Sequence, residues 1–134
     1  MMQEQYVSFE TAKLLKQKGF NAICLMLWFD ENHPFLADRR DEDGNYFKNS
    51  ELKEEEYSAP TQAFVMKWLR ENHNLFIEPT VGVTGDKWWY DFDIIPVNGR
   101  DIKWNHYVEM PVVEYGSPEE AIEVAIKYCL ENLV

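Results

Sequence analysis

The carboxylates of the segment KWWYDFDII, residues 87–95, are the strongest candidates for ligand chemistry in this sequence. Asp91 and Asp93 are two positions apart, so on a strand their side chains point to the same face, roughly 6.6 Å from each other. Glu78 and Glu109 fall on the neighbouring predicted strands. Together they offer the oxygen ligands that hard divalent cations bind. A carboxylate metal site is therefore one interpretation of this segment, although the spacing alone fixes no coordination geometry.

Two other interpretations fit the same residues. An antiparallel sheet often has one solvated face, and aromatic residues favour strands in any case. The face can also be a recognition surface, in which aromatic side chains anchor a partner and carboxylates select its charge. Alternation along the strands assigns seven residues to this face: Phe76, Glu78, Trp89, Asp91, Asp93, Tyr107 and Glu109.

The opposite face of the same strand is apolar. Trp88, Tyr90, Phe92 and Ile94 alternate with the residues of the polar face. A shift of one residue would exchange the two faces, so a buried face specifies the register strongly. The pattern therefore predicts that Trp88, Tyr90 and Phe92 are buried and that Asp91 and Asp93 are exposed.

Three helices are predicted around these strands. In VSFETAKLLKQKGFN, Ser8 is a good N-cap and Gly19 can adopt the left-handed conformation that ends a helix. In SAPTQAFVMKWLRENHN, Pro60 suits the first helical position. In SPEEAIEVAIKYCLENLV, Ser117 and Glu120 have the spacing of a capping box.

The strands complete an α+β prediction. Residues 75–83, 87–97 and 103–113 read as three strands, with Asn98-Gly99 as a hairpin turn before the third. The apolar run at residues 22–29 reads as a strand buried on both faces, followed by a short strand at 35–37. We therefore expect an antiparallel sheet of three to five strands, with helices mainly on one face. The second half of the chain should have the order α-β-β-β-α.

Length and charge limit the classes of function and partner that we expect. A chain of 134 residues predicts a single domain over 1–134. Its net charge of −11 disfavours direct binding to nucleic acid or to acidic membranes. No apolar run is long enough to span a membrane and no secretory signal is recognisable, which predicts a cytoplasmic protein. Residues 38–56 are rich in charge and predict a mobile acidic loop.

The remaining motifs indicate no catalytic chemistry. The segment DRRDEDGNYFKNSE has the glycine of a calcium loop at Gly44, but Arg39 and Ser50 stand where such a loop needs Asp and Glu. The three histidines lack metal-ligand spacing, and no nucleophile motif or phosphate-binding glycine loop is present. Cys24 and Cys129 read as free, buried thiols. We expect no catalytic residue, no metal and no cofactor, and therefore no enzyme.

Three segments together resemble a known family: YVSFETAKLLKQKGF, YSAPTQAFVMKWLRENHNLFIE and SPEEAIEVAIKYCLENLV. They are similar to small acidic proteins of uncharacterised function in Bacteroides-type bacteria, which prophages and other mobile elements often encode. The resemblance covers about half of the chain and implies a genomic setting, but it supplies no catalytic or binding residues.

The sequence thus favours a non-enzymatic protein-binding module. Its expected partner is a protein with a basic surface, such as a host protein in a prophage setting. Homodimerisation is a further alternative that the sequence does not decide. The alternative is a domain that binds a small molecule or a divalent metal through the polar face of the sheet.

Overall fold

The computed structural model describes residues 5–98, 101–102, 108 and 111–134. These residues form three α-helices and two antiparallel sheets, which confirms the α+β prediction. The chain divides into two compact units, residues 1–61 and 62–134. A single domain over 1–134 therefore stays a prediction.

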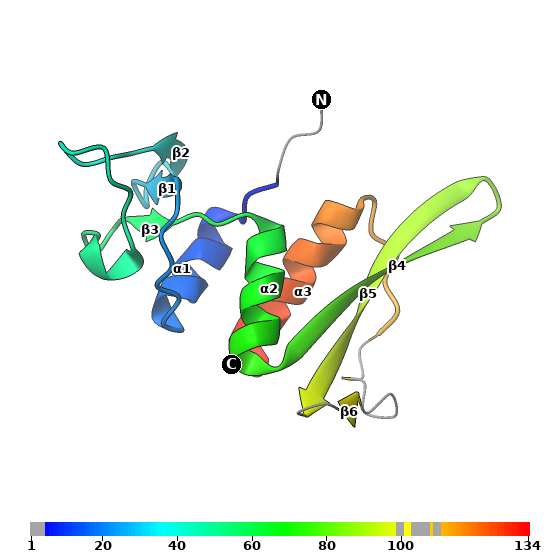
Figure 1. The fold of residues 1–134 in the computed structure, drawn as a ribbon. Helices are drawn as coiled ribbons and strands as arrows, with labels where there is room; N and C mark the ends of the chain where they lie inside the picture. Colours follow the sequence, from blue (N-terminus) through cyan, green and yellow to red (C-terminus); the bar gives the residue numbers. More distant parts are fainter. Residues whose placement is uncertain (1–4, 99–100, 103–107, 109–110) are drawn as a thin grey trace. The chain divides into compact units, whose positions relative to one another are not determined.

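The first unit combines one α-helix with a small sheet (Figure 1). Helix α1 spans Phe9–Gln17 and strands β1, β2 and β3 span Met26–Phe29, Phe35–Asp38 and Tyr57–Ser58, in the sheet order β2-β1-β3. A short 3-10 helix, η1, spans Asn49–Glu51.

Both predicted ends of α1 are confirmed. The Ser8 hydroxyl accepts a hydrogen bond from Thr11 N at 3.2 Å. At the other end Gly19 has a φ of +86°, and Phe20 N donates to Leu15 O at 2.9 Å. This closing pattern returns the chain onto the helix, so the Phe20 side chain is buried.

The prediction of a strand buried on both faces at residues 22–29 is wrong. Strand β1 begins only at Met26, and the side chains of Ile23 and Leu25 are exposed while Cys24 and Leu27 are buried. The small sheet therefore buries one side of this run. An apolar run without polar interruptions does not reveal this alternation.

The acidic segment 38–56 is irregular, but several side chains hold it. Asn49 is buried; its side-chain amide donates to Phe20 O at 2.8 Å and its carbonyl accepts from Ser58 N at 2.9 Å. The Asp41 carboxylate accepts from the backbone of Asn45 at 2.8 Å. Mobility of this segment stays a prediction, which amide exchange would test. The contacts of Asn49 and Asp41 restrict any such motion to the stretches between these residues.

The second unit has the predicted order α-β-β-β-α. Helix α2 spans Gln62–His73, strands β4, β5 and β6 span Leu75–Thr84, Lys87–Asn98 and Asp101–Ile102, and helix α3 spans Pro118–Asn132. The sheet order is β4-β5-β6, and the pair Asn98↔Asp101 closes the predicted second hairpin. Most of the predicted third strand, 103–113, lies outside the described residues.

The helix starts refine two predictions. Pro60 does not occupy the first position of α2, because Thr61 is still extended and pairs with Tyr6 before the helix begins at Gln62. In α3 the Ser117 hydroxyl caps Glu120 N at 3.1 Å, as predicted. The Glu120 carboxylate accepts from Gly116 N at 3.3 Å, one residue before the donor of a standard capping box.

The core of the second unit lies between α2, α3 and the near half of the β4–β5 hairpin. Its fully or almost fully buried side chains are Val65, Leu69, Leu75, Ile77, Phe92, Ile94, Ala121, Ala125, Ile126, Cys129 and Leu130. The hairpin continues well past both helices before it turns (Figure 1). This far half of the hairpin, residues 80–91, is called the arm below.

Candidate protein-binding surface

The register of the β4–β5 hairpin confirms the predicted assignment of faces on these two strands. Directly opposite residues are Glu78↔Asp93, Gly82↔Trp89 and Val83↔Trp88. Opposite residues in an antiparallel pair share a face, so Phe76, Glu78, Trp89, Asp91 and Asp93 lie together. Tyr107 and Glu109, the other two predicted members, lie outside the described residues.

The predicted burial of Trp88 is wrong, and this error reveals the main feature of the arm. Trp88 is 66% exposed, and Val81 and Val83 on the same face are 58% and 52% exposed. Tyr90 is half-buried, and only Phe92 reaches the core as predicted. The apolar face therefore changes from core to open surface along a single hairpin.

Element lengths explain the change. The 12-residue strand β5 is roughly 40 Å long at about 3.3 Å per residue. The 12-residue helix α2 and the 15-residue helix α3 are roughly 18 Å and 22 Å long at about 1.5 Å per residue. Helices of this length cannot cover the whole hairpin. The predicted strands are already longer than the predicted helices in the sequence. This difference in length is the signal that could have identified Val81, Val83 and Trp88 as exposed.

On the polar face, Trp89 is only half-buried and packs against the arm itself. Its indole ring lies against Gly82, where an added Cβ atom would come within 2.0 Å of the ring. Its indole N–H donates to the Thr84 hydroxyl at 3.0 Å. The glycine thus leaves space for the ring, and Trp89 is less available to a partner than Trp88.

The carboxylates on this face differ in their surroundings. The prediction that Asp91 is exposed is not confirmed, because it is half-buried. It accepts hydrogen bonds from Phe92 N at 2.9 Å and Val113 N at 3.3 Å, so it has a structural role. Glu78 and Asp93 are exposed and directly opposite each other. Like charges in this position destabilise a sheet. This pair is therefore a cost to the fold that a basic partner would remove.

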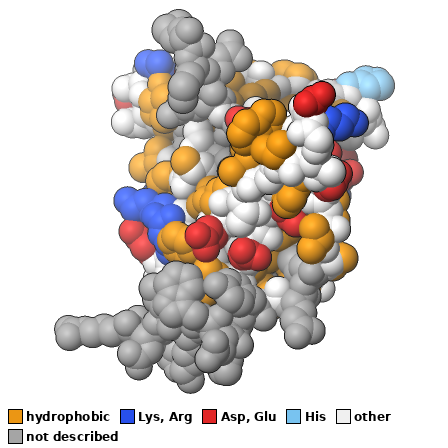
Figure 2. Space-filling view, turned by 90° about the vertical axis from the view of Figure 1, so that its right-hand side faces the viewer, with side chains coloured by type: hydrophobic (Ala, Val, Ile, Leu, Met, Phe, Trp, Pro, Cys, Tyr) orange, Lys and Arg blue, Asp and Glu red, His pale blue; other side chains and the backbone are white. Residues whose placement is uncertain are grey.

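Beside these carboxylates, Phe76 on the polar face is partly exposed and has the Arg70 guanidinium 5.7 Å from its ring centre. Ile95, which shares this face, is buried. The near half of the polar face therefore combines one buried apolar residue with the exposed Phe76, Glu78 and Asp93. In Figure 2 hydrophobic side chains lie among carboxylates on the surface in view.

The outer edge of the arm also carries backbone groups that a partner can reach. Tyr90 exchanges two hydrogen bonds with Tyr115, at 3.0 and 2.8 Å, so its backbone groups point away from β4. Its partner Val81 must then direct its own N–H and C=O outward, and so must Val83. Pro79 has the same orientation but has no N–H, as is usual for an edge strand. No strand in the described part of the chain pairs with this edge.

The metal interpretation gains no support from the geometry. Within the described ranges, no group of three or more His, Cys, Asp or Glu side chains is placed to hold a metal. Likewise, no helix among the described residues is long and apolar enough to cross a membrane.

Comparisons with known proteins do not assign this chain to a family. No protein-family model matches the chain, and neither curated proteins nor solved structures gave a match. The resemblance to small acidic proteins of mobile elements therefore stays an expectation from the three quoted segments.

Proposed function

We propose that this protein is a non-enzymatic binding module whose arm docks onto a partner protein with a basic surface that also exposes apolar side chains. The observation that carries the proposal is the 66% exposure of Trp88, next to the exposed Val81 and Val83. Tryptophan is among the residue types that most often dominate interface energetics.

Charge favours a basic partner over a second copy of the chain. Four carboxylates on the hairpin, Glu78, Asp86, Asp91 and Asp93, outnumber its one lysine, Lys87. Two copies would each contribute a net charge of −11, and the repulsion would oppose their association. A basic partner instead relieves the opposition of Glu78 and Asp93 and is attracted over a long range.

The resemblance to proteins of prophages and mobile elements supplies a candidate class of partner. A compact acidic protein of this kind could cover the nucleic-acid-binding surface of a host protein in the cytoplasm. The host, the compartment and the absence of enzymatic activity are parts of this proposal. The alternative, a small molecule or metal on the polar face, has less support because Trp89 and Asp91 are engaged within the arm.

The test compares two exposed apolar side chains of similar accessibility. Ile23 in the first unit is 57% exposed, so Ile23→Ser is a matched control for Trp88→Ser. Proteins captured from the native host by the full chain are identified, purified and measured against the wild type and both variants. We expect Trp88→Ser to weaken binding of the partner by about 30-fold or more, and Ile23→Ser to leave it unchanged.

Two results would contradict this proposal. One is a partner that binds Trp88→Ser as tightly as the wild type. The other is concentration-dependent self-association of the pure chain that Trp88→Ser abolishes, because this would make a second copy the occupant of the arm. Sedimentation of the pure protein at several concentrations distinguishes this second result.

A further inference from the structure

A pocket with a volume of about 490 Å³ lies in the first unit, whereas the β4–β5 hairpin belongs to the second. Its lining residues come from α1, from the turn after β1 and from the chain before and within β3: Lys13, Lys16, Gln17, Glu31, Glu54, Glu55 and Tyr57. Pockets that hold small ligands have volumes of this order.

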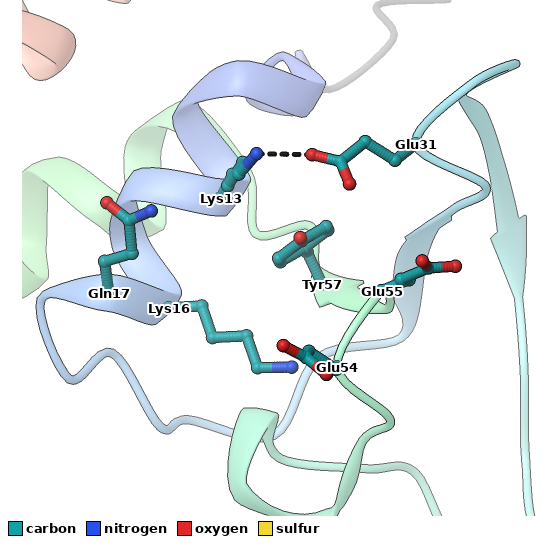
Figure 3. Close-up of a pocket in the computed structure, with 7 residues that line it drawn as sticks. All are labelled: Lys13, Lys16, Gln17, Glu31, Glu54, Glu55 and Tyr57. Atoms are coloured by element: carbon teal, nitrogen blue, oxygen red, sulfur yellow. Dashed lines mark hydrogen bonds and ion pairs between the residues drawn. The ribbon is translucent and has the colours of Figure 1, made fainter.

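The two walls of the pocket carry opposite kinds of polar group (Figure 3). The ammonium groups of Lys13 and Lys16 and the Gln17 amide all come from α1. The carboxylates of Glu31, Glu54 and Glu55 all lie on the opposite side. The pocket therefore has a donor wall and an acceptor wall, which suits a ligand that carries both charges.

Some of these groups are already engaged. Lys13 forms an ion pair with Glu31 across one end of the pocket. Lys16 donates to Lys53 O at 2.8 Å and Glu56 O at 2.9 Å, which holds its ammonium group in place. Burial lowers the pKa of Lys16, and the charges of Glu56 and Glu54 partly offset this shift. Neither Glu54 nor Glu55 has a hydrogen bond or ion pair within the described residues, so both carboxylates can contact a ligand.

Tyr57 supplies the second, independent sign of a binding site. Its side chain is 6% exposed, and its ring packs against Phe9 with 5.4 Å between ring centres. Its hydroxyl oxygen lies in the middle of the ring of labelled side chains in Figure 3. In the described part of the chain this hydroxyl has no hydrogen-bond partner, and its oxygen is not enclosed by protein, so it is open to a ligand in the pocket.

The Tyr57 hydroxyl is a hydrogen-bond donor at neutral pH. Burial raises the pKa of Tyr57 above its ordinary value, and the nearby carboxylate of Glu31 raises it further. A tyrosine hydroxyl is protonated at neutral pH even at its ordinary pKa of about 10. The Tyr57 hydroxyl can therefore donate a hydrogen bond to a ligand carboxylate.

We infer that this pocket binds a small zwitterion with the chemistry of an amino acid or short peptide. The ligand carboxylate accepts from the Tyr57 hydroxyl and faces the lysines of α1, and the ligand ammonium group faces Glu54 and Glu55. This inference does not depend on the arm, because every lining residue belongs to the first unit.

The test is an NMR titration of the full chain with alanine and with the dipeptide alanyl-alanine. N-acetyl-alanine and alanine amide are the matched ligands, since each lacks one of the two charges. We expect saturable shifts of the Tyr57 and Glu54 amides with a zwitterion, and at least about tenfold weaker binding of both blocked ligands, because each loses a charge-assisted contact. Tighter binding of alanine or of the dipeptide distinguishes a free amino acid from a peptide.

Variants of the lining residues test which side chains contact the ligand. Tyr57→Phe keeps the ring and should weaken binding about 2- to 10-fold, the usual effect of one hydrogen bond. Glu54→Gln with Glu55→Gln should weaken binding at least about tenfold. Glu42→Gln with Glu71→Gln removes the same charge from exposed positions outside the pocket and should have no effect.

Either of two results would overturn the inference. One is the absence of saturable shifts at about 50 mM ligand, a concentration that detects dissociation constants in the low-millimolar range. The other is equal binding of the zwitterions and the blocked ligands. Both results would leave the proposal for the arm untouched, because Trp88 is not part of this pocket.

Discussion

The indole ring of Trp89 occupies the space that a side chain at its cross-strand partner Gly82 would need. The ring makes up for the packing that a glycine removes from the interior of a strand, and the glycine gives the ring a place on the arm. This relationship explains why Trp89 packs against the arm while its neighbour Trp88 stays exposed.

Replacement of Gly82 tests this relationship. In Gly82→Ala the new Cβ would lie 2.0 Å from a ring atom, so the indole must move and lose its hydrogen bond to Thr84. We expect a loss of about 1–3 kcal/mol in the free energy of unfolding and a large shift of the Trp89 indole N–H resonance. Gly116→Ala is the control, because its Cβ would meet only Glu120, at an ordinary 3.5 Å. An unshifted indole resonance in Gly82→Ala would contradict this packing.

The opposition of Glu78 and Asp93 predicts a gain in stability on neutralisation. Either Glu78→Gln or Asp93→Asn should raise the free energy of unfolding by about 0.2–1 kcal/mol, because each removes the same repulsion. The double variant should add little to either single one, which denaturant unfolding of all four proteins would measure. The same double variant should slow association with a basic partner. Destabilisation by both single variants would show that these carboxylates serve the fold.

The prediction for the first unit concerns Asn49. Its side chain joins Phe20 O to Ser58 N inside the unit. Asn49→Ala leaves both groups buried without this partner, so we expect a loss of about 2–4 kcal/mol in the free energy of unfolding. Asn21→Ala removes one bond at the exposed amide of Ser50 and should cost less than about 1 kcal/mol. Equal effects of both variants in denaturant unfolding would be inconsistent with this anchoring role.

The buried thiols predict a specific dependence on pH. Burial raises the pKa of Cys24 to about 11 and that of Cys129 to about 12, well above the usual value of about 8.5. The folded state therefore holds these protons more tightly than the unfolded state does. Their contribution to stability should be complete below about pH 8.5 and be lost as the pH rises towards 11 and 12.

Chemical labelling measures the same property at lower pH. At pH 8 we expect both thiols of the folded protein to react with iodoacetamide much more slowly than a free thiol, since thiolate is the reactive form. Denatured protein is the control and should react at the ordinary rate. Rapid labelling of Cys129 without denaturant would mean that α3 opens readily.

Local sequence signals predicted the helices well because their ends depend on residues close together in the chain. Ser8, Gly19 and Ser117 each act on their own helix, so neighbours in the sequence determine the outcome. Alternation likewise predicted which residues of β4 and β5 share a face.

Burial was harder to predict because it depends on what lies over a face. Trp88 and Phe92 have the same parity on β5, yet Trp88 is exposed and Phe92 is buried, since the helices reach only one end of the hairpin. Ile23 and Leu25 are exposed for a similar reason, in a run that looks like core. The Tyr57 pocket joins residues from three separate parts of the first unit, and no local pattern connects them.

Photo-crosslinking from position 88 tests the central claim most directly. A photoreactive amino acid replaces Trp88 in one sample and the similarly exposed Ile23 in another, and crosslinked proteins from the native host are identified by mass spectrometry. The proposal predicts that position 88, and not position 23, crosslinks to one main protein with a basic surface, and that this yield falls as the salt concentration rises. Crosslinks from position 88 only to other copies of this chain, or no specific crosslink at all, would contradict the claim that the arm docks onto a basic partner.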